Sequence, residues 1–564
     1  MTAFHWLLVI LVFHFIHGIG TWRFYELSGY KRWQAFVPVY NMAIFMKIIN
    51  RPTWWIVLLY IPIINLLMIP VIWLELLQNF GKTERKEAWI TVLTLGLYLA
   101  YLNYTNPGVH ITDRSLIKKT AAGDTLSSVV FAVIVATLVH TYAIQPFVIP
   151  TASLEKSLLI GDFLFVSKFH YGARTPMTPI AAPMVHDTIP LIKTKSYLSW
   201  PQLPYFRFPG FEDIQRNDIV VFNWPADTVY KFFDRSGRSV VKPIDKKSNY
   251  VKRCVGLPGD SLQILHGDIY INGKLNVLPE RAKPQFFYTL VAKGDSCDPL
   301  LDEYDLRHET MFSFNIRKDL WENPQVQKYF SENHFTLQEF ARDSSNVAVC
   351  GQIDQETFNK LNMQLNEKAI GVNLTQEKYE KLKADTRVES VKRFEFPGGN
   401  SVFPQVAKLN WSVDNFGTLF IPKAGSTVPL NENTYPIYKK AIRVYEGQDL
   451  KHVGGQFYIG DKAVTSYTFQ KNYYWMMGDN RHNSEDSRYW GFVPDDHIVG
   501  KPVFIWFSLD WNTPKWSERI RWDRLFTTVS GDGQPQSYFQ WFLLALVGYF
   551  VGNYFWNKRK NSKA

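Results

Sequence analysis

One segment near the middle of the chain carries more information than any other: Tyr250-Val251-Lys252-Arg253-Cys254-Val255-Gly256-Leu257-Pro258-Gly259-Asp260. Its lysine, Lys252, stands among the apolar residues Val251, Val255 and Leu257. Burial among such side chains disfavours the ammonium ion and lowers the pKa of a lysine toward neutrality, where the neutral amine can act as a general base. Most lysines are solvated surface charges, so a catalytic Lys252 requires a nucleophile elsewhere in the chain.

A second segment supplies a candidate nucleophile, Ser153. It runs Gln145-Pro146-Phe147-Val148-Ile149-Pro150-Thr151-Ala152-Ser153 and is followed by Leu158-Leu159-Ile160-Gly161-Asp162. A serine hydroxyl is a poor nucleophile at neutral pH and needs a base to accept its proton. Ser153 follows closely on the apolar segment 126–144, which places its hydroxyl where a substrate leaves the bilayer. An isolated serine near a proline more often belongs to a turn or a helix cap.

A third segment lies far from the first two: Met477-Gly478-Asp479-Asn480-Arg481-His482-Asn483-Ser484-Glu485-Asp486-Ser487-Arg488-Tyr489-Trp490-Gly491-Phe492-Val493-Pro494. Together, and in this order, the three segments resemble the type I signal peptidases, the serine–lysine protease family S26. The stretch 218–222 matches a fourth segment of that family. The resemblance covers roughly residues 125–275 and 455–510, and motifs of this length in the correct order are highly specific.

The resemblance implies a role for each matched residue. Ser153 is the nucleophile and Lys252 the general base of a Ser/Lys dyad, and the Thr151 hydroxyl joins the Ser153 N–H in stabilising the oxyanion. Ser484 orients the lysine amine. Asp486 and Arg488 form a supporting ion pair, Ser487 lies near them, and Gly478, Asp479 and Asn480 shape the loop that holds Ser484. A purely structural role is an equal alternative for Asp486, Ser487 and Arg488.

The chain departs from the family pattern at three positions. Leu154 replaces the usual Met after the nucleophile, a conservative apolar exchange. Lys156 stands where a proline is common, which leaves the local turn uncertain, and His482 replaces an acidic residue. The section from about 299 to 391 is also longer than in short family members, so its role is unassigned.

Fold and substrate follow from the same resemblance. It implies a mainly-β extracytoplasmic catalytic domain with a signal-peptidase/LexA-like β fold, and a serine endopeptidase that cleaves signal peptides of exported preproteins after a small-x-small pattern. The substrate would add as a strand to an exposed sheet edge. Candidate pocket walls are Phe147, Val148, Ile149 and Pro150, for which plain apolar core is the alternative. No metal or organic cofactor is implied.

Short runs rich in Val, Ile, Phe and Tyr agree with a β-rich core, since Gly, Pro, Asn and Asp bound them. Examples are 163–166, 219–222, 268–271 and 502–505. The section 299–391 is instead charged and predicts an inserted α+β unit. Its helical signals are a capping box at Thr336-Leu337-Gln338-Glu339 and the spacing of Phe358, Leu361 and Leu365.

Composition places part of the chain in a membrane, because 46% of its 564 residues are apolar and only 20% charged. Candidate spans are 4–19, 54–77, 88–104, 126–144 and 539–555, although Pro62, Asn65 and Pro70 suggest a kinked or re-entrant second span. Residues 33–82 resemble a small polytopic module found fused to other proteins. The net charge of +11 includes no dense basic patch with interleaved aromatics, so we expect no nucleic-acid partner.

The flanking charges predict which side of the membrane each part faces. By the positive-inside rule, the basic flanks of the fourth and fifth spans are cytoplasmic, so residues 145–538 face outward. The cluster Lys82, Arg85 and Lys86 conflicts with this count and leaves the topology of 53–104 open. The basic residues behind the assignment are Arg114, Lys118, Lys119, Lys558, Arg559, Lys560 and Lys563.

We therefore predict a multi-pass protein of the bacterial cytoplasmic (inner) membrane whose catalytic domain faces the periplasm. Its expected partners are signal peptides, membrane lipid and the secretion translocon. The predicted division is a polytopic membrane module (1–124), a transmembrane helix leading to the catalytic core (125–145), the first part of the catalytic β core (146–275), an inserted α+β domain (276–455), the second part of the core (456–515) and a C-terminal transmembrane anchor with a basic tail (516–564).

Two other classes of function compete with the peptidase. Ser153-Leu154-Glu155-Lys156 fits the Ser-x-x-Lys pattern of penicillin-interactive serine acyl enzymes, but the chain has no Lys-Thr-Gly triplet. A catalytically inactive membrane scaffold is the second alternative, and the presence of both Ser153 and Lys252 argues against it. The three cysteines are too few for a disulfide framework, and Cys297 and Cys350 are either a pair or two separate thiols.

Overall fold

The computed structural model describes residues 2–113, 121–190, 192–229, 239–307, 310–333, 335, 337–351, 353–531 and 533–561. The chain forms two compact units. One comprises residues 1–146, 166–213 and 222–250, and the other residues 147–165, 214–221 and 251–564.

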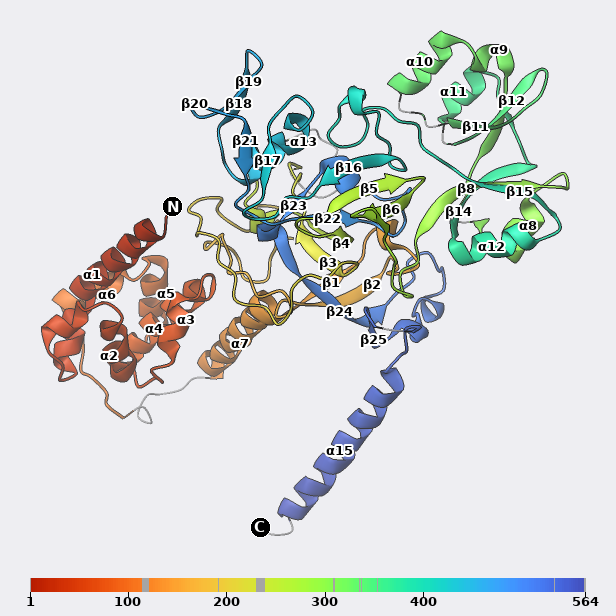
Figure 1. Ribbon diagram of the computed structural model, residues 1–564. Coiled ribbons are helices and arrows are strands. Elements are labelled where there is room, and N and C mark those ends of the chain that lie inside the picture. Colours follow the sequence, from red (N-terminus) through yellow and green to blue (C-terminus); the bar gives the residue numbers. More distant parts are fainter. Residues whose placement is uncertain are drawn as a thin grey trace. The chain divides into compact units, whose positions relative to one another are not determined.

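The first unit begins with a group of helices (Figure 1). They are α1 (Ala3–Leu27), α2 (Tyr40–Ile48), α3 (Trp55–Tyr60), α4 (Ile64–Asn79), α5 (Arg85–Leu93), α6 (Leu97–Tyr104) and α7 (Ala121–Leu138), which a π-helical turn extends to Ala143. A core shared by α1, α2, α4 and α6 contains Phe24, Phe45, Trp73 and Phe80. Small residues let α1 and α6 approach closely, since a Cβ at Gly20 would lie 3.3 Å from the Cβ of Ala100.

Among the described residues, two helices are long and apolar enough to cross a membrane: α1, and the helix over Thr125–Ala143. The predicted span 88–104 is wrong as a single helix. Leu95 and Gly96 both adopt positive φ and separate α5 from α6. The predicted span 54–77 is also broken, between α3 and α4 at Pro62 and Ile63. Arg114, Lys118, Lys119 and Lys563, used for the orientation, lie outside the described residues.

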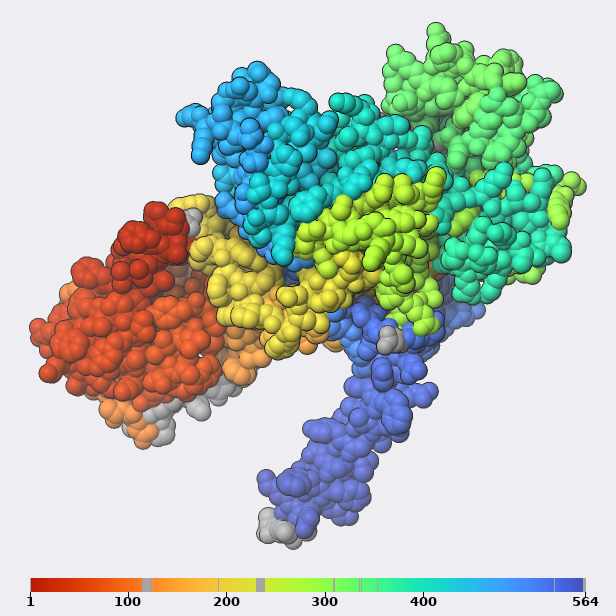
Figure 2. Space-filling model, viewed as in Figure 1, coloured from red at the N-terminus to blue at the C-terminus, as the bar shows by residue number. Residues whose placement is uncertain are grey.

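The predicted C-terminal span is a helix, α15 (Phe539–Asn561). Its large apolar side chains are exposed, among them Trp541, Val547 and Phe550; the segment is the elongated blue part of Figure 2. Its composition is less apolar than that of the two helices above, so it does not meet the same criterion.

An eight-stranded sheet is the largest sheet among the described residues, which confirms the mainly-β prediction. Its order is β1-β2-β24-β3-β4-β22-β23, and β25 pairs with β24. The predicted strands 163–166, 219–222 and 502–505 lie in β2, β3 and β24. The strands are β1 (Ile144–Val148), β2 (Asp162–Ser167), β3 (Ile219–Asn223), β4 (Asn249–Gly256), β22 (Tyr473–Met477), β23 (Val493–Pro494), β24 (Ile498–Ser508) and β25 (Thr527–Thr528).

A smaller sheet, β16-β5-β6-β7, packs with the second unit's main core. Its strands are β16 (Phe416–Phe420), β5 (Ser261–Leu265), β6 (Asp268–Ile271) and β7 (Lys274–Leu275). Leu262, Phe416, Trp475 and Phe492 share one buried cluster. The predicted insertion over 276–455 therefore includes, at its C-terminal end, residues that pack with the core. Nearby lie α13 (Tyr435–Lys440), the β17–β21 pair (Thr427–Pro429, Ser466–Thr468) and the sheet β18-β19-β20 (Leu450–Val453, Gln456–Ile459, Lys462–Val464).

Residues 285–393 fold into two small α+β layers. The first is the sheet β15-β8-β14-β9 with α8 and α12, and the second the sheet β11-β12-β10-β13 with α9, α10 and α11. The bounds are β8 (Gln285–Ala292), α8 (Asp298–Glu303), β9 (Thr310–Met311), β10 (Ser313–Arg317), α9 (Lys318–Trp321), α10 (Pro324–Glu332), β11 (Leu337–Arg342), β12 (Asn346–Gly351), α11 (Gln355–Lys360), β13 (Gln364–Leu365), β14 (Ala369–Thr375), α12 (Gln376–Ala384) and β15 (Val388–Arg393).

Two local predictions in this region are wrong. The capping box at 336–339 starts no helix: Thr336 lies outside the described residues, and Leu337–Arg342 is strand β11, paired antiparallel with the apolar strand β12. Tertiary pairing here overrides the local cap signal. The helical spacing of Phe358, Leu361 and Leu365 ends early, because α11 stops at Lys360 and Leu365 lies in β13. Cys254, Cys297 and Cys350 are buried free thiols.

Candidate active site

Strand pairing places Lys252 beside Gly478. In the antiparallel pair β4–β22, Arg253 lies opposite Met477, so the preceding Lys252 and the following Gly478 are neighbours across the two strands. The Lys252 side chain is only 4% exposed. Its burial lowers the pKa of Lys252 to about 8, although the carboxylates of Asp486 and Glu485 act in the opposite direction. A buried lysine of this kind holds a substantial neutral fraction near pH 8.

The turn that contains Ser153 also lies against Gly478. Ser153 lies in a single 3-10 turn, Ala152–Leu154, and is 6% exposed. The Asn480 N–H donates to the Ser153 carbonyl (3.0 Å), and Asn480 Nδ2 donates to the Ala152 carbonyl (3.1 Å). A Cβ at Gly478 would lie 2.5 Å from the Ser153 carbonyl and 2.3 Å from Ser484 Oγ. Only glycine permits this approach, so Ser153, Lys252 and Ser484 all border Gly478.

Asp486 is the centre of a buried hydrogen-bond network. Its carboxylate accepts from Ser484 Oγ (2.9 Å) and from the Gly478 N–H (3.1 Å). Arg488 donates to both oxygens, through Nε (2.9 Å) and Nη2 (2.8 Å). Burial alone would raise the pKa of Asp486, but the Arg488 charge and hydrogen bonds outweigh it and hold that pKa below its usual value. Ser487 Oγ accepts from the Met476 N–H (3.0 Å), which ties the same loop to β22.

A second buried ion pair anchors the loop on its other side. Arg253 donates to Asp479 through Nε (2.7 Å) and Nη2 (2.6 Å), and Ser157 Oγ donates to Asp479 Oδ2 (2.6 Å). Sequence reasoning assigned no role to Arg253 or Ser157. The sequence did contain a signal for this ion pair, because an arginine inside an otherwise apolar strand needs a carboxylate as its counter-ion.

Two amide side chains of the insertion also contact these loops, and sequence reasoning missed both. Gln285 Nε2 donates to the Glu155 carbonyl (2.6 Å), just after the Ser153 turn. Asn373 Nδ2 donates to Asn480 Oδ1 (3.0 Å). These are pairings over long sequence distances, and nothing in the local sequence signals them.

The three departures from the family pattern have distinct surroundings. Leu154 is buried. Lys156 adopts φ 66°, a value that the proline ring cannot reach, so the turn after Ser153 differs from one built on proline. His482 Nδ1 accepts from the Phe287 N–H (3.0 Å), and its Nε2 donates to Asp414 (2.7 Å), which connects the motif loop to the insertion.

The predicted substrate-side residues lie on and just after β1, which stands at the edge of the eight-stranded sheet. Val148, Pro150 and Thr151 are exposed, Phe147 is half-buried and Ile149 is buried. An edge strand offers unpaired backbone groups to an extended peptide. Ile149 is 3% exposed, so it contributes little surface to any pocket.

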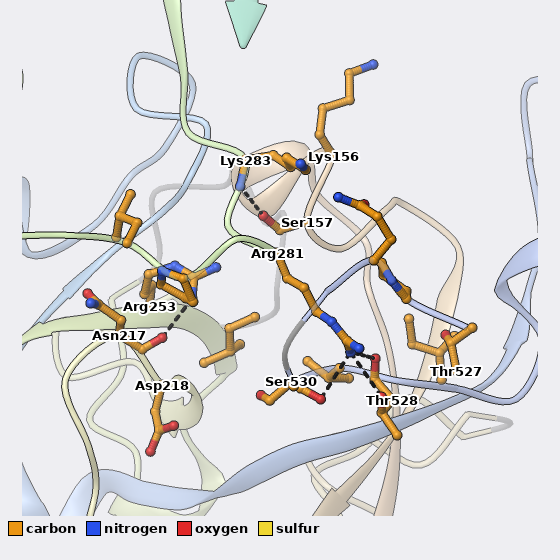
Figure 3. A pocket seen from close by; sticks show the side chains of 18 of the residues that line it. Lys156, Ser157, Asn217, Asp218, Arg253, Arg281, Lys283, Thr527, Thr528 and Ser530 are labelled. Carbon is orange, nitrogen blue, oxygen red and sulfur yellow. Dashed lines mark hydrogen bonds between the residues drawn. The ribbon is translucent and has the colours of Figure 1, made fainter. Parts of the chain in front are cut away.

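A cavity of about 710 Å³ lies next to the residues that follow the Ser153 turn, since Lys156 and Ser157 line it (Figure 3). Ser157 faces the Lys283 N–H in this view, and Arg281 points toward Thr528 and Ser530 of the C-terminal segment. Three of its arginines are paired with buried carboxylates: Arg216 with Asp260, Arg253 with Asp479 and Arg524 with Asp162. The residues that line this cavity include neither Ser153 nor Lys252. We interpret it as a space left where several segments of the chain pack together, and not as the reaction site. In the part of the chain that the structure describes, no cluster of three or more His, Cys, Asp or Glu could hold a metal ion.

The core and its motif loops define a serine peptidase of the S26 class. The model of the family described as signal peptidase, peptidase S26, matches residues 122–314 and 424–507, and the chain belongs to this family. A family of unknown function, DUF5684, matches residues 33–109.

The chain is similar to proteins named Signal peptidase I from several bacteria. The protein of Buchnera aphidicola subsp. Acyrthosiphon pisum is 25% identical over 388 residues, covering 69% of this chain and 76% of the relative. That of Helicobacter pylori (strain 26695) is 23% identical over 415 residues, covering 72% and 92%. A protein of Haemophilus influenzae is 48% identical over 56 residues, covering 10% and 16%. These matches confirm the predicted family and the serine endopeptidase class.

Proposed function

We propose that the chain removes N-terminal signal peptides from exported preproteins, with Ser153 as the nucleophile and Lys252 as the general base. The observation that carries the dyad is a buried lysine with its pKa lowered to about 8, adjacent to the glycine that the Ser153 carbonyl approaches. The similarity to proteins named Signal peptidase I supports the substrate class.

In the proposed first step, the neutral Lys252 amine accepts the Ser153 hydroxyl proton while the serine oxygen attacks the scissile carbonyl. The Ser153 N–H and the Thr151 hydroxyl then stabilise the oxyanion; one such donor is worth about 100- to 1000-fold in rate. The ammonium gives its proton to the leaving amine, so the mature protein departs and the signal peptide remains as an ester on Ser153. Water, deprotonated by Lys252, hydrolyses that ester and restores both groups.

Ser484 and Asp486 act on this step through the lysine. Ser484 Oγ donates its proton to Asp486 in a hydrogen bond. The lone pairs of the Ser484 oxygen are therefore available to accept from an N–H of Lys252. An amine held in one orientation transfers its proton from a defined direction, which lowers the cost of reaching the transition state. We propose the same positioning role for Arg488, which keeps Asp486 ionised and fixed, and for Ser487 through its contact with β22.

The substrate would bind along the exposed edge of β1, with small side chains near Phe147, Val148, Ile149 and Pro150 and the scissile bond at Ser153. Two helices long and apolar enough to cross a membrane support residence in the bacterial cytoplasmic membrane. We further propose that the catalytic domain faces the periplasm, that the N-terminal module and α15 complete a multi-pass anchor, and that lipid and the secretion translocon are partners.

The direct test is cleavage of a preprotein with an Ala-x-Ala site by the purified chain in lipid. The wild type should release the mature protein and Ser153→Ala should not. Ser466→Ala, at an exposed position in β21, serves as a matched control and should cleave normally. Equal cleavage by Ser153→Ala would show that another residue is the nucleophile. Absence of cleavage by the folded wild type would favour the inactive scaffold.

A further inference from the structure

Three positively charged side chains gather at the end of the second helix that is long and apolar enough to cross a membrane. The backbone N–H of Lys168 donates to the carbonyl of Ala143 (2.9 Å), the last residue of that helix. Arg174 and Arg207 both act electrostatically on Lys168. All four residues belong to the first unit, so they share one compact body. We call Lys168, Arg174 and Arg207 the cation cluster.

Backbone pairing holds the two arginines next to each other. Arg174 and Arg207 form an antiparallel β-bridge. The flanking backbone hydrogen bonds run from the Phe208 N–H to the Ala173 carbonyl (2.9 Å) and from the Thr175 N–H to the Phe206 carbonyl (3.0 Å). In this type of antiparallel pair the two Cα atoms are about 4.5 Å apart and both side chains project from the same face. Like charges directly opposite each other are destabilising, so this geometry favours an anion between them.

The third cation adds to the same repulsion. The Lys168 side chain makes no hydrogen bond or ion pair with any residue that the structure describes. Burial and the positive charges of Arg174 and Arg207 lower the pKa of Lys168 to about 7. Each of the three residues is only half-buried and keeps some exposed surface. An anion that approaches from outside therefore meets three cationic groups that are already in position.

The shape of the donors selects the kind of anion. Arg174 Nη2 donates to Asn223 Oδ1 (2.7 Å), and Arg207 Nη1 donates to the Gly172 carbonyl (2.7 Å). These bonds orient both guanidinium groups. A guanidinium carries five N–H donors in a planar fork that matches two phosphate oxygens, and an ammonium adds a compact charge. The cation cluster is therefore suited to a phosphate group.

Exposed aromatic side chains surround the cluster in the chain. Phe169 follows Lys168, and segment 198–211 runs through Arg207. The exposed aromatic residues of that segment are Trp200, Tyr205, Phe206, Phe208 and Phe211. Trp and Tyr concentrate where a bilayer meets water, and Phe adds apolar contact with the boundary of the acyl chains. This surface favours a lipid phosphate over a soluble one.

Both helices that are able to cross a membrane contact segment 198–211 near one of their ends. Tyr142, at the end of the helix over Thr125–Ala143, packs edge-on against Phe208, with 6.3 Å between the ring centroids. Trp6, near the start of α1, donates through Nε1 to the Gln202 carbonyl (3.0 Å). The ends of a helix that crosses a bilayer lie at the level of the lipid headgroups. Segment 198–211 and the cation cluster then lie at that level as well.

We propose that Lys168, Arg174 and Arg207 bind the phosphodiester headgroup of an anionic phospholipid of the phosphatidylglycerol class. The proposal rests on the membrane residence proposed above and specifies which lipid the chain contacts and where. The bound headgroup is offset from the Ser153–Lys252 dyad in sequence, and no residue of the cation cluster takes part in the proposed cleavage.

The test uses the full-length chain, purified in detergent, and counts bound lipids by native mass spectrometry. Dioleoyl-phosphatidylglycerol and dioleoyl-phosphatidylcholine are offered in equal amounts, because both contain a phosphodiester and differ in net charge. The wild type should retain phosphatidylglycerol in clear preference. Lys168→Met keeps the apolar stem of the side chain and should lower that preference about tenfold, the factor expected for one charge-assisted hydrogen bond.

Lys193→Met is the matched control, because it removes the same charge from an exposed position of the same unit. It should leave the preference unchanged. Thermal unfolding shows that the variants are folded. In phosphatidylcholine, Lys168→Met should be at least as stable as the wild type, since it removes a cation that lies beside two others. Addition of phosphatidylglycerol should raise the Tm of the wild type and of Lys193→Met but not that of Lys168→Met.

Three outcomes would overturn the proposal. Equal retention of the two lipids by the wild type would show that no anionic headgroup is selected. An equal loss of preference in Lys168→Met and Lys193→Met would show that overall surface charge, and not this cluster, attracts the lipid. Displacement of phosphatidylglycerol by an equal concentration of inorganic phosphate would show a site for a soluble anion.

Preprotein cleavage by the same samples separates this proposal from the peptidase function. Cleavage by a wild type that shows no lipid preference would remove the headgroup site alone. A lipid preference that depends on Lys168, in a wild type that does not cleave, would support the headgroup site and contradict the proposed function.

Discussion

The Ser153 turn is held by two sets of contacts that differ in origin. On one side, the motif loop 478–488 contributes Asn480 and Gly478, and its aspartates Asp486 and Asp479 pair with arginines of the loop and of β4. On the other side, the insertion contributes Gln285 and Asn373, single amides that reach the turn and the loop from β8 and β14. The first set combines buried charges with hydrogen bonds, and the second consists of neutral hydrogen bonds.

This difference implies unequal consequences for function. Buried ions leave a large penalty when one partner is lost, whereas a neutral hydrogen bond is worth about 1 kcal/mol. We therefore expect the motif loop to determine whether the site works and the insertion to adjust how well it is positioned. The predictions below test that division, from the largest expected effect to the smallest.

Loss of the base should have the largest effect. Lys252→Ala should lower kcat by about 10²- to 10⁴-fold or more, because a positioned general base contributes about that factor. Single-turnover cleavage of an Ala-x-Ala preprotein measures it, and circular dichroism should show an intact fold. Lys462→Ala, in the exposed strand β20, is the matched lysine control. Activity that survives in Lys252→Ala would exclude the serine–lysine mechanism.

Breaking the buried pair of the motif loop should come next. Asp486→Asn keeps the shape of the side chain but leaves the Arg488 charge buried without a counter-ion. We expect a loss of about 3–5 kcal/mol in the free energy of unfolding, together with reduced kcat. Denaturant unfolding measures the loss. Asp449→Asn removes an exposed partner of Lys451 and should change neither quantity. A fully stable Asp486→Asn would contradict the network described above.

The pH dependence of activity and of stability should report the protonation of the Lys252 amine. With the pKa of Lys252 lowered to about 8, kcat/KM should rise as pH increases through about 8, because the neutral amine is the active form. The stability effect has the same sign. Below pH 8 the folded chain holds a buried ammonium at a cost of about 3 kcal/mol, and that cost disappears between pH 8 and the ordinary lysine value of 10.5.

Lys252→Met tests the stability part of that prediction, because Met fills similar space without titrating. The variant should be more stable than the wild type below pH 8, and the difference should shrink as pH rises toward 10.5. Thermal unfolding at several pH values measures it. A constant difference across that range would mean that the amine does not lose a proton there.

The sequence named residues that the structure brings together around Gly478, but it did not name the residues that surround them, and the physical reason is the range of the interactions. Ser153, Lys252 and the loop from Gly478 to Arg488 occur in long motifs, and the local pattern also predicts the core strands β2, β3 and β24. Helix breaks at Leu95–Gly96 depend on backbone conformations that apolar composition does not reveal. Strand β11 forms despite a capping box because β12 offers a partner, and such pairing over distance cannot be derived from a local window.

The smallest predicted effect concerns the insertion. Gln285→Ala removes two side-chain hydrogen bonds: Nε2 donates to the Glu155 carbonyl, and Oε1 accepts from Asn373 Nδ2. The loss of the bond to the turn should lower kcat by about three- to tenfold, the equivalent of one neutral hydrogen bond. Substrate affinity should change little, since Gln285 contacts the Glu155 backbone and not the proposed substrate-binding edge of β1. Gln364→Ala, exposed in β13 of the same insertion, is the control and should cleave normally. If Gln285→Ala were as damaging as Asp486→Asn, the insertion would be part of the catalytic machinery and the division between the two sets of contacts would fail. If Gln285→Ala had no effect while Asn373→Ala did, the insertion would act through Asn480 alone, because Asn373 donates to that side chain.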